Sequence, residues 1–290
     1  MARPILLIHG GAGSRSVQGE KYFAYRESLQ RILAKAYPLL HRGGSALKAV
    51  ARAVELLEDD PLYNAGRGSK IQKDGQIRMS ASIMDGDRRA FAGCVNVEGV
   101  KNPIRLAEKL LKEEDRVLAG EGARQFAKKL GLPFASPFTP RARADFTAKK
   151  SGKTGTVGAV AIDSRGRLAA ATSTGGRGFE FPGRVSDSPT VAGNFANAHC
   201  AVSATGVGEE IVDFALAATL CAQVAGGKSL TKASRGIQKE AEKAHASFGW
   251  IAIDFRGQVV ADTTTETLIW ASAATIEKNR HSFFLESKNT

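Results

Sequence analysis

Hairpin turns of one kind recur along the chain and limit the folds that it can adopt. In two places an apolar run is followed by Asp, two further residues and Gly, and then by a second apolar run: 157–162 with 168–174, and 250–253 with 259–262. A related turn, Lys73-Asp74-Gly75-Gln76, precedes the apolar run 77–83. Asp before a turn and Gly within it are typical of tight connections between antiparallel strands. The sequence therefore predicts antiparallel sheets.

Helical patterns lie between these strands. Apolar residues at helical spacing predict helices over 22–40, 46–57, 103–111, 116–130, 209–225 and 230–246, and residues 198–204 predict a further strand. Ser45 is the expected N-cap of the second helix, and Gly131 is the expected stop signal of the fourth. Hairpins mixed with pairs of helices favour an α+β layered sandwich and argue against a parallel nucleotide-binding sheet.

The composition is that of a soluble globular domain. The chain has 290 residues, of which 43% are hydrophobic and 24% charged. Its apolar runs at 5–8 and 211–225 are too short for a signal-peptide core or a membrane span. We therefore expect a cytoplasmic protein without a membrane segment. The three cysteines lack metal-ligand spacing and are predicted to be free thiols.

A formal net charge of +12 raises the possibility of an acidic partner. One predicted helix carries a basic stripe of Lys228, Lys232, Arg235, Lys239 and Lys243, opposite an apolar face of Leu230, Ala233, Ile237, Ala241 and Ala244. No aromatic residues alternate with these cations, as they do in many nucleic-acid-binding surfaces. We interpret the stripe as a solvated helix face and do not expect nucleic acid to be a partner.

The junction between Gly155 and Thr156 is the first candidate for chemistry. Residues 132–155 are rich in Pro, Ser, Thr and basic residues and are predicted to be a flexible linker, which ends where a buried strand begins. A threonine hydroxyl is a weak nucleophile without a base. The α-amine of an N-terminal threonine, with a pKa near ~7.7–8.0, is such a base. The simpler reading is that a β-branched residue starts a strand.

Seven segments, in the same order, resemble those of the plant-type asparaginases, also called isoaspartyl peptidases, of the N-terminal-nucleophile hydrolase superfamily. They span most of the chain: HGGAG (9–13), NAGRGS (64–69), ASIMDG (81–86), GTVGAVAID (155–163), ATSTGG (171–176), PGRVSDSP (182–189) and ATGVGEE (204–210). The resemblance implies a single domain, 1–290, with a four-layer αββα sandwich whose antiparallel sheets lie between helix layers.

The resemblance also implies a role for each matching residue. The chain would cut itself between Gly155 and Thr156, and Thr156 would then act as nucleophile through its free amine. Thr174 would orient that nucleophile. Arg184 would bind the α-carboxylate of the substrate bidentately, and Asp187 its α-ammonium. Read without the resemblance, these last two side chains would form only a local salt bridge.

Four further residues complete the implied site. Thr205 and the backbone of Gly206 resemble the oxyanion hole, Asn64 resembles a residue that supports it, and Gly208 would line the substrate pocket. Ser186 stands where the family usually has Gly, which leaves the substrate preference open.

The resemblance implies no cofactor for the chemistry but suggests a structural sodium ion. Its ligands would be backbone carbonyls, which suit a hard cation, from Leu57, Glu58, Asp60, Tyr63, Ala65 and Arg67. The alternative reading of this segment is a helix end followed by a turn.

The activity implied is hydrolysis of the side-chain amide of L-asparagine and of isoaspartyl dipeptides through an acyl-enzyme. Residues 1–155 (with linker 132–155) and 156–290 would become the α and β subunits of an (αβ)2 assembly. One alternative is a glycosylasparaginase or threonine endopeptidase of the same superfamily. The other is a non-catalytic basic binding module, which the charge of +12 motivates.

Overall fold

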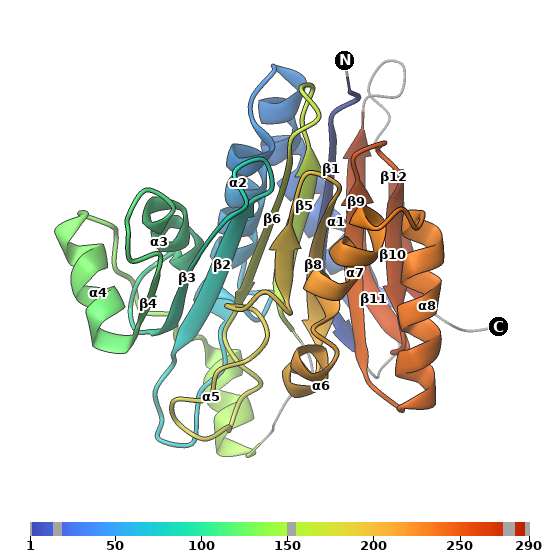
Figure 1. The fold of residues 1–290 in the computed structure, drawn as a ribbon. Coiled ribbons are helices and arrows are strands. Elements are labelled where there is room, and N and C mark those ends of the chain that lie inside the picture. Colours follow the sequence, from blue (N-terminus) through green and yellow to red (C-terminus); the bar gives the residue numbers. More distant parts are fainter. Residues whose placement is uncertain (1, 14–18, 150–154, 275–281, 288–290) are drawn as a thin grey trace.

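Two β-sheets lie face to face between layers of helices in the computed structural model, which describes residues 2–13, 19–149, 155–274 and 282–287 (Figure 1). The larger sheet has the order β12 (Ser282–Ser287), β11 (Thr267–Ala274), β1 (Ile5–Gly13), β5 (Val157–Ile162), β6 (Leu168–Thr174), β2 (Met79–Asp85), β3 (Ala90–Val97) and β4 (Val117–Ala119). The smaller sheet has the order β10 (Val259–Thr263), β9 (Phe248–Asp254), β8 (Cys200–Gly206) and β7 (Asn194–Ala196). Every pair is antiparallel except β3 with β4.

Helices cover the outer face of each sheet. The larger sheet is covered by α1 (Gly19–His41), α2 (Ala46–Asp59) and α3 (Pro103–Leu110), with α4 (Gly120–Lys129) beside β3. The smaller sheet is covered by α7 (Leu216–Ala225) and α8 (Leu230–Lys243), and the short α6 (Gly208–Asp213) follows β8. A 3-10 turn, η1 (Gly66–Gly68), contacts α2, and α5 (Pro140–Thr147) precedes β5 in the chain. The predicted αββα sandwich is confirmed.

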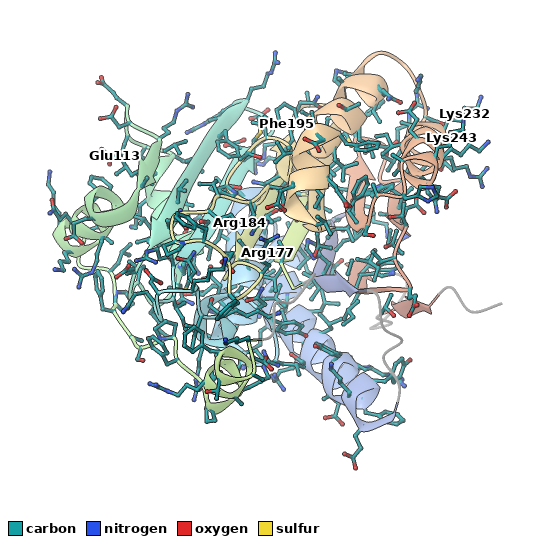
Figure 2. The ribbon with its side chains drawn as sticks, turned by 90° about the horizontal axis from the view of Figure 1, so that it is seen from below. Glu113, Arg177, Arg184, Phe195, Lys232 and Lys243 are labelled. Atoms are coloured by element: carbon teal, nitrogen blue, oxygen red, sulfur yellow. The ribbon has the colours of Figure 1, made fainter. Side chains whose placement is uncertain are left out.

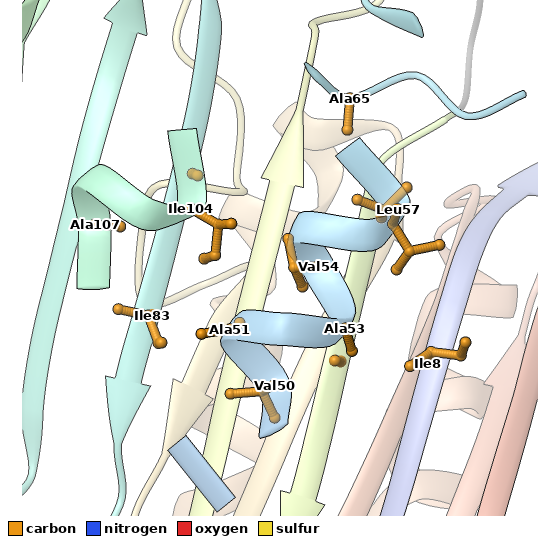
Figure 3. Packing of buried hydrophobic residues seen from close by; sticks show 14 of the residues in the cluster. Ile8, Val50, Ala51, Ala53, Val54, Leu57, Ala65, Ile83, Ile104 and Ala107 are labelled. Atoms are coloured by element: carbon orange, nitrogen blue, oxygen red, sulfur yellow. The ribbon is translucent and has the colours of Figure 1, made fainter. Parts of the chain in front are cut away.

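Strand β5 shows why this sequence selects a layered fold. Its six residues are all buried, but alternate side chains enter different cores. Val157, Ala159 and Ala161 pack with the helix layer of α1 to α3, whereas Val160 and Ile162 pack between the two sheets. In Figure 3, side chains of α2 such as Val54 reach the first of these cores. A strand apolar on both faces needs a cover on each side, and the second sheet provides one of them.

The two predicted hairpins form as expected, and their aspartates determine the turns. Asp163 Oδ1 accepts hydrogen bonds from the backbone N–H groups of Arg165 and Arg167 at 3.0 and 3.1 Å. Asp254 Oδ1 accepts in the same way from Arg256 and Gln258 at 2.9 and 2.8 Å. The turn at 73–76 does not form a hairpin, because the chain before it is not a strand. Strand β2, which follows it, pairs instead with β3 and β6.

Three expectations need correction. Helix α4 begins only at Gly120, because residues 117–119 extend the larger sheet as β4. The helix expected over 209–225 is broken between α6 and α7, where Ala215 adopts a left-handed conformation with φ 43°. The expected linker 132–155 contains helix α5, which Thr139 caps by accepting from the backbone N–H of Ala142 at 3.1 Å. Residues 150–154 lie outside the described residues.

Several other expectations are confirmed. Ser45 caps α2 by accepting from the N–H of Lys48 at 3.3 Å. The three cysteines are free and buried. Helix α8 is amphipathic, with buried Leu230, Ala233, Ile237 and Ala241 and an exposed basic face that includes Lys232 and Lys243 (Figure 2), although Ala244 is exposed. Among the helices of the described ranges, none combines the length and apolar character needed to cross a membrane.

Candidate active site

Thr156 lies at the start of the central strand β5, between β1 and β6. Thr156 is only 6% exposed to solvent. Because β5 and β6 are antiparallel and Val157 pairs with Ser173, the start of β5 meets the end of β6, and Thr174 is brought beside Thr156. The Thr156 hydroxyl donates to Thr174 Oγ1 at 3.3 Å. The predicted nucleophile and the residue predicted to orient it are therefore in contact.

The hydroxyl of Thr174 is itself held in place. Its Oγ1 also accepts from the backbone N–H of Gly176 at 3.2 Å. A second hydroxyl, that of Ser188, lies 3.5 Å from Thr156 Oγ1 and is fully buried. Ser188 was not among the predicted site residues. It directly follows Asp187 in the chain, and that adjacency was the only sequence signal for it.

The bond before Thr156 lies in a crowded place. Gly155 has φ +137°, a conformation that favours glycine, and a Cβ there would come within 2.6 Å of Asn64 Cβ. Asn64 also ties down the segment after Thr174: its Nδ2 donates to the carbonyl of Gly176, and its own carbonyl accepts from the N–H of Gly175 at 3.0 Å. Asn64 thus lies against Gly155, which precedes Thr156, and is hydrogen-bonded to Gly175 and Gly176, which follow Thr174.

Thr205 connects the two sheets at the nucleophile. Its side chain, at the end of β8, accepts from the N–H of Ala12 at 3.3 Å and donates to the backbone carbonyl of Thr156 at 3.4 Å. Gly206 follows with φ +144°, and a Cβ there would lie 2.5 Å from Phe248 Cα. Of the two residues expected at an oxyanion hole, Thr205 contacts Thr156, with its proton directed to the carbonyl of Thr156 itself, and Gly206 follows Thr205 in the chain and packs against Phe248.

Arg184 and Asp187 meet at Gly208. A Cβ on Gly208 would lie 2.9 Å from Asp187 Oδ1 and 3.0 Å from Arg184 Nη2, so only glycine leaves room for both charged groups. The direct ion-pair partner of Arg184 is Glu209, to which Nε and Nη2 donate at 2.7 and 2.8 Å. The simple Arg184–Asp187 salt bridge is thus not the arrangement formed. Figure 2 shows Arg184 in the loops below the sheets, where Arg177 is also labelled.

Asp187 has an unusual environment for a carboxyl group. It is 1% exposed, and one of its oxygens, Oδ2, has no hydrogen-bond partner among the described residues. Burial raises its pKa to about 7, while its own backbone N–H and the nearby Arg184 charge act in the opposite direction. A buried, half-satisfied carboxylate is suited to accept from an incoming cation. Ser186, the departure from the family pattern, is buried next to it.

A row of buried, hydrogen-bonded polar side chains lies against β5, the strand that follows Thr156. His9 Nε2 is 2.8 Å from Ser203 Oγ, which is 2.7 Å from Thr172 Oγ1. Any Cβ on Gly158 would collide with Ser203 and His9, so Gly158 makes room for this row. Burial lowers the pKa of His9 to about 3, and the imidazole is therefore neutral at neutral pH. The hydrogen bond of His9 goes to Ser203 and not to Thr156 Oγ1, so the imidazole supports the strand and does not act on the Thr156 hydroxyl.

The segment 57–67 curls tightly enough to bring carbonyl groups together. A Cβ on Gly66 would collide with the carbonyl oxygen of Glu58, and one on Gly68 with that of Tyr63. The carbonyls of Leu57, Asp60 and Ala65 accept backbone hydrogen bonds within the loop. Within the described ranges there is no group of three or more His, Cys, Asp or Glu side chains that could hold a metal.

Comparison with known proteins gives a consistent result. The model of the asparaginase family matches residues 2–282. An isoaspartyl peptidase/L-asparaginase of Synechocystis is 42% identical over 92% of this chain and 87% of its own length. Another from Nostoc is 41% identical, covering 93% and 91% respectively, and the isoaspartyl peptidase of Escherichia coli K12 is 38% identical, covering 92% and 91%.

Proposed function

The chain belongs to the asparaginase family, and from that premise we propose that it is a threonine-type amidohydrolase acting on L-asparagine and on β-aspartyl dipeptides. One observation carries the proposal. The buried hydroxyl of Thr156 lies at the start of a central strand, 3.3 Å from Thr174 Oγ1. Relatives at 36–42% identity bear the name isoaspartyl peptidase/L-asparaginase, which supports both substrates.

The first step is self-cleavage before Thr156. The Thr156 oxygen attacks the carbonyl carbon of Gly155, the C–N bond breaks, and the nitrogen takes the hydroxyl proton, which leaves an ester. Water then hydrolyses the ester to a Gly155 carboxylate and a free Thr156 amine. The φ of +137° at Gly155 and its packing against Asn64 support the step, because they restrain the scissile bond. The products are residues 1–155 and 156–290.

Hydrolysis then uses the amine as base. Thr156 Oγ1 attacks the side-chain carbonyl of the substrate, and its proton passes through the amine to the leaving nitrogen. The resulting aspartyl ester is hydrolysed by water, which gives up its proton to the same amine. In this scheme Thr174 fixes the hydroxyl, and Thr205, Gly206 and Asn64 surround the developing oxyanion. Thr205 must turn its proton from the Thr156 carbonyl toward the oxyanion.

The substrate head group determines the specificity. Arg184 binds the α-carboxylate and Asp187 the α-ammonium, and Gly208 keeps the space between them open. A head group with one anion and one cation on the same carbon matches these two residues. Ser186 is buried beside them, with its Cβ 3.0 Å from where a Cβ on Gly208 would lie.

Two further features are proposed from the family resemblance. A sodium ion would be held by the backbone carbonyls of the segment 57–67, which the tight turns at Gly66 and Gly68 support. The cleaved pair would assemble with a second copy as (αβ)2. Thermal unfolding in sodium against choline chloride tests the first proposal, and light scattering of the purified protein tests the second.

The main experiment combines mass and activity. Purified wild type is expected to yield a fragment that begins Thr-Val-Gly-Ala-Val and to release ammonia from asparagine, whereas Thr156→Ala stays intact and inactive. Parallel assays with a β-aspartyl dipeptide and with glycosylated asparagine define the leaving group. An intact chain that hydrolyses asparagine fully would contradict the role of the free amine.

A further inference from the structure

Glu209 forms the closest ion pair of the candidate substrate pocket. Both of its carboxylate oxygens accept from Arg184, from Nε at 2.7 Å and from Nη2 at 2.8 Å. The Arg184 side chain is 14% exposed and that of Glu209 is 51% exposed. This two-point geometry fixes the plane of the guanidinium and its rotation within that plane, which a single contact cannot do.

The pairing leaves one edge of Arg184 for a second anion. A guanidinium has five N–H donors, and Glu209 uses the edge formed by Nε and Nη2. The two protons of Nη1 and the second proton of Nη2 remain, and one proton of Nη1 together with that of Nη2 forms another edge that can hold a carboxylate bidentately. Nη2 is also the atom near Gly208 and therefore on the side of Asp187. The free edge thus begins beside the residue expected to bind the α-ammonium.

Arg184 needs external support because of where it lies. It belongs to the irregular segment between β6 and β7, next to Gly183 with φ +89° and to Val185, which is exposed. No strand or helix fixes its backbone, and its long side chain has many rotamers to lose on binding. Glu209, by contrast, lies in the first turn of α6, directly after the strand β8 that carries Thr205.

We propose that Glu209 is a positioning residue, which holds Arg184 so that its Nη1–Nη2 edge receives the α-carboxylate of the substrate; this rests on the proposed function. Glu209 touches neither the substrate nor Thr156 in this arrangement. Its contribution is to substrate binding through Arg184, and the chemical step is unaffected. The hydrogen bonds from Arg184 lower the pKa of Glu209 to about 2, so its carboxyl group is ionised at neutral pH.

The test is a steady-state comparison of wild type with Glu209→Gln, using asparagine and a β-aspartyl dipeptide. We expect KM to rise about tenfold, at the low end for hydrogen bonds to charged groups because the pair is partly exposed, with kcat within twofold of wild type. The inhibition constant of L-aspartate, which carries the same head group, should rise in parallel. Glu209→Asp, which keeps the charge on a shorter side chain, should give an intermediate KM.

Asp213→Asn is the matched control. It removes one negative charge from the same helix at an exposed position and should leave KM unchanged. Thermal unfolding of all variants checks that they fold. If Glu209→Gln does not fold, the KM of Glu209→Asp tests the inference instead. An unchanged KM would overturn the inference, and a lower KM would show that Glu209 competes with the substrate for Arg184. Wild type that hydrolyses neither substrate would instead refute the proposed function.

Discussion

The hydroxyl oxygens of Thr156 and Thr174 lie 3.3 Å apart, at the adjoining ends of two antiparallel strands. The contact requires no loop, since the register of β5 with β6 places the two residues together. The proposed nucleophile is thereby positioned by regular strand pairing, and sites built on strands are more precise than sites built on loops.

Thr174→Val should lower kcat while leaving KM within about twofold. The valine side chain has nearly the same shape but cannot accept the hydrogen bond from Thr156, and the loss of one such bond is worth about 1 kcal/mol, or roughly fivefold in rate. Thr174→Ser retains the hydroxyl and serves as the control. Equal activity of the valine and serine variants would show that the contact does not orient the nucleophile.

Gly155→Ala should slow or abolish self-cleavage, as judged by intact mass over time. The added methyl would lie 2.6 Å from Asn64 Cβ and would occupy a backbone conformation that disfavours side chains. Gly166→Ala is the control for replacing a glycine of positive φ away from the scissile bond, because Gly166 has open space around it, and it should cleave at the wild-type rate. Cleavage of the Gly155 variant at the wild-type rate would mean that the packing at this bond is unimportant.

The apparent affinity for substrate should fall as the pH drops below neutrality. Burial raises the pKa of Asp187 to about 7, so that in the free protein the carboxyl is increasingly protonated below that pH and cannot pair with an ammonium group. KM for asparagine is therefore expected to rise from pH 8 to pH 5.5. In Asp187→Asn, KM should be high throughout and lose this dependence, as initial rates across the range will show.

Asp187 should lower the free energy of unfolding at higher pH. Because the folded-state pKa of Asp187 lies above its ordinary value of 3.8, its contribution to stability is greatest below pH 3.8 and is lost as the pH rises toward about 7. Asp187→Asn should thus raise the denaturant midpoint at pH 8 relative to wild type, with a smaller difference at pH 4. A variant that is less stable at pH 8 would contradict this reasoning.

Gly208→Ala should raise KM sharply and leave the fold intact. A methyl group there would be 2.9 Å from Asp187 Oδ1 and 3.0 Å from Arg184 Nη2, and both groups would have to move. Gly236→Ala, in helix α8 with open space around the site, is the control. It should stabilise the protein by roughly 0.5–1 kcal/mol and leave KM unchanged. Kinetics and thermal unfolding of the two variants provide the comparison.

Acid should destabilise the protein partly through His9. Burial lowers its pKa from 6.5 to about 3, so its contribution to stability is complete above pH 6.5 and is lost as the pH falls toward 3. His9→Gln should flatten this part of the profile of unfolding free energy against pH, although the variant is less stable at pH 7 because the bond to Ser203 changes.

The hairpin pattern accounts for the part of the site that rests on regular structure, whereas the family resemblance supplied the role of each residue. Thr156 and Thr174 flank a hairpin whose turn chemistry is explicit in Asp163 and Gly166, so their proximity was predictable. Glu209 was not identified, because its partner Arg184 comes from an irregular loop 25 residues away and no periodicity connects the two. Ser188 was missed for a related reason: an Asp-Ser pair in a loop does not indicate which of the two faces the nucleophile.

The errors in the fold have local physical causes. The expected helix over 209–225 is apolar enough to be continuous, yet Ala215 turns left-handed so that α7 can pack on β8 while α6 stays beside the pocket. Strand β4 was taken for the start of a helix because three residues are too few to show an alternation. Such choices are made by tertiary packing, which local propensity does not report.

Strand β1 lies between β11 and β5, and β2 lies beside β6, so residues from both sides of position 155 alternate across one hydrogen-bonded sheet. Cleavage of the chain there would leave two polypeptides whose strands are interleaved in a single sheet. They could separate only by breaking the pairings of β11 with β1, β1 with β5 and β6 with β2, and once separated they would have to find one another by diffusion. Maturation would then convert a fold that a single molecule can regain into one whose recovery depends on concentration.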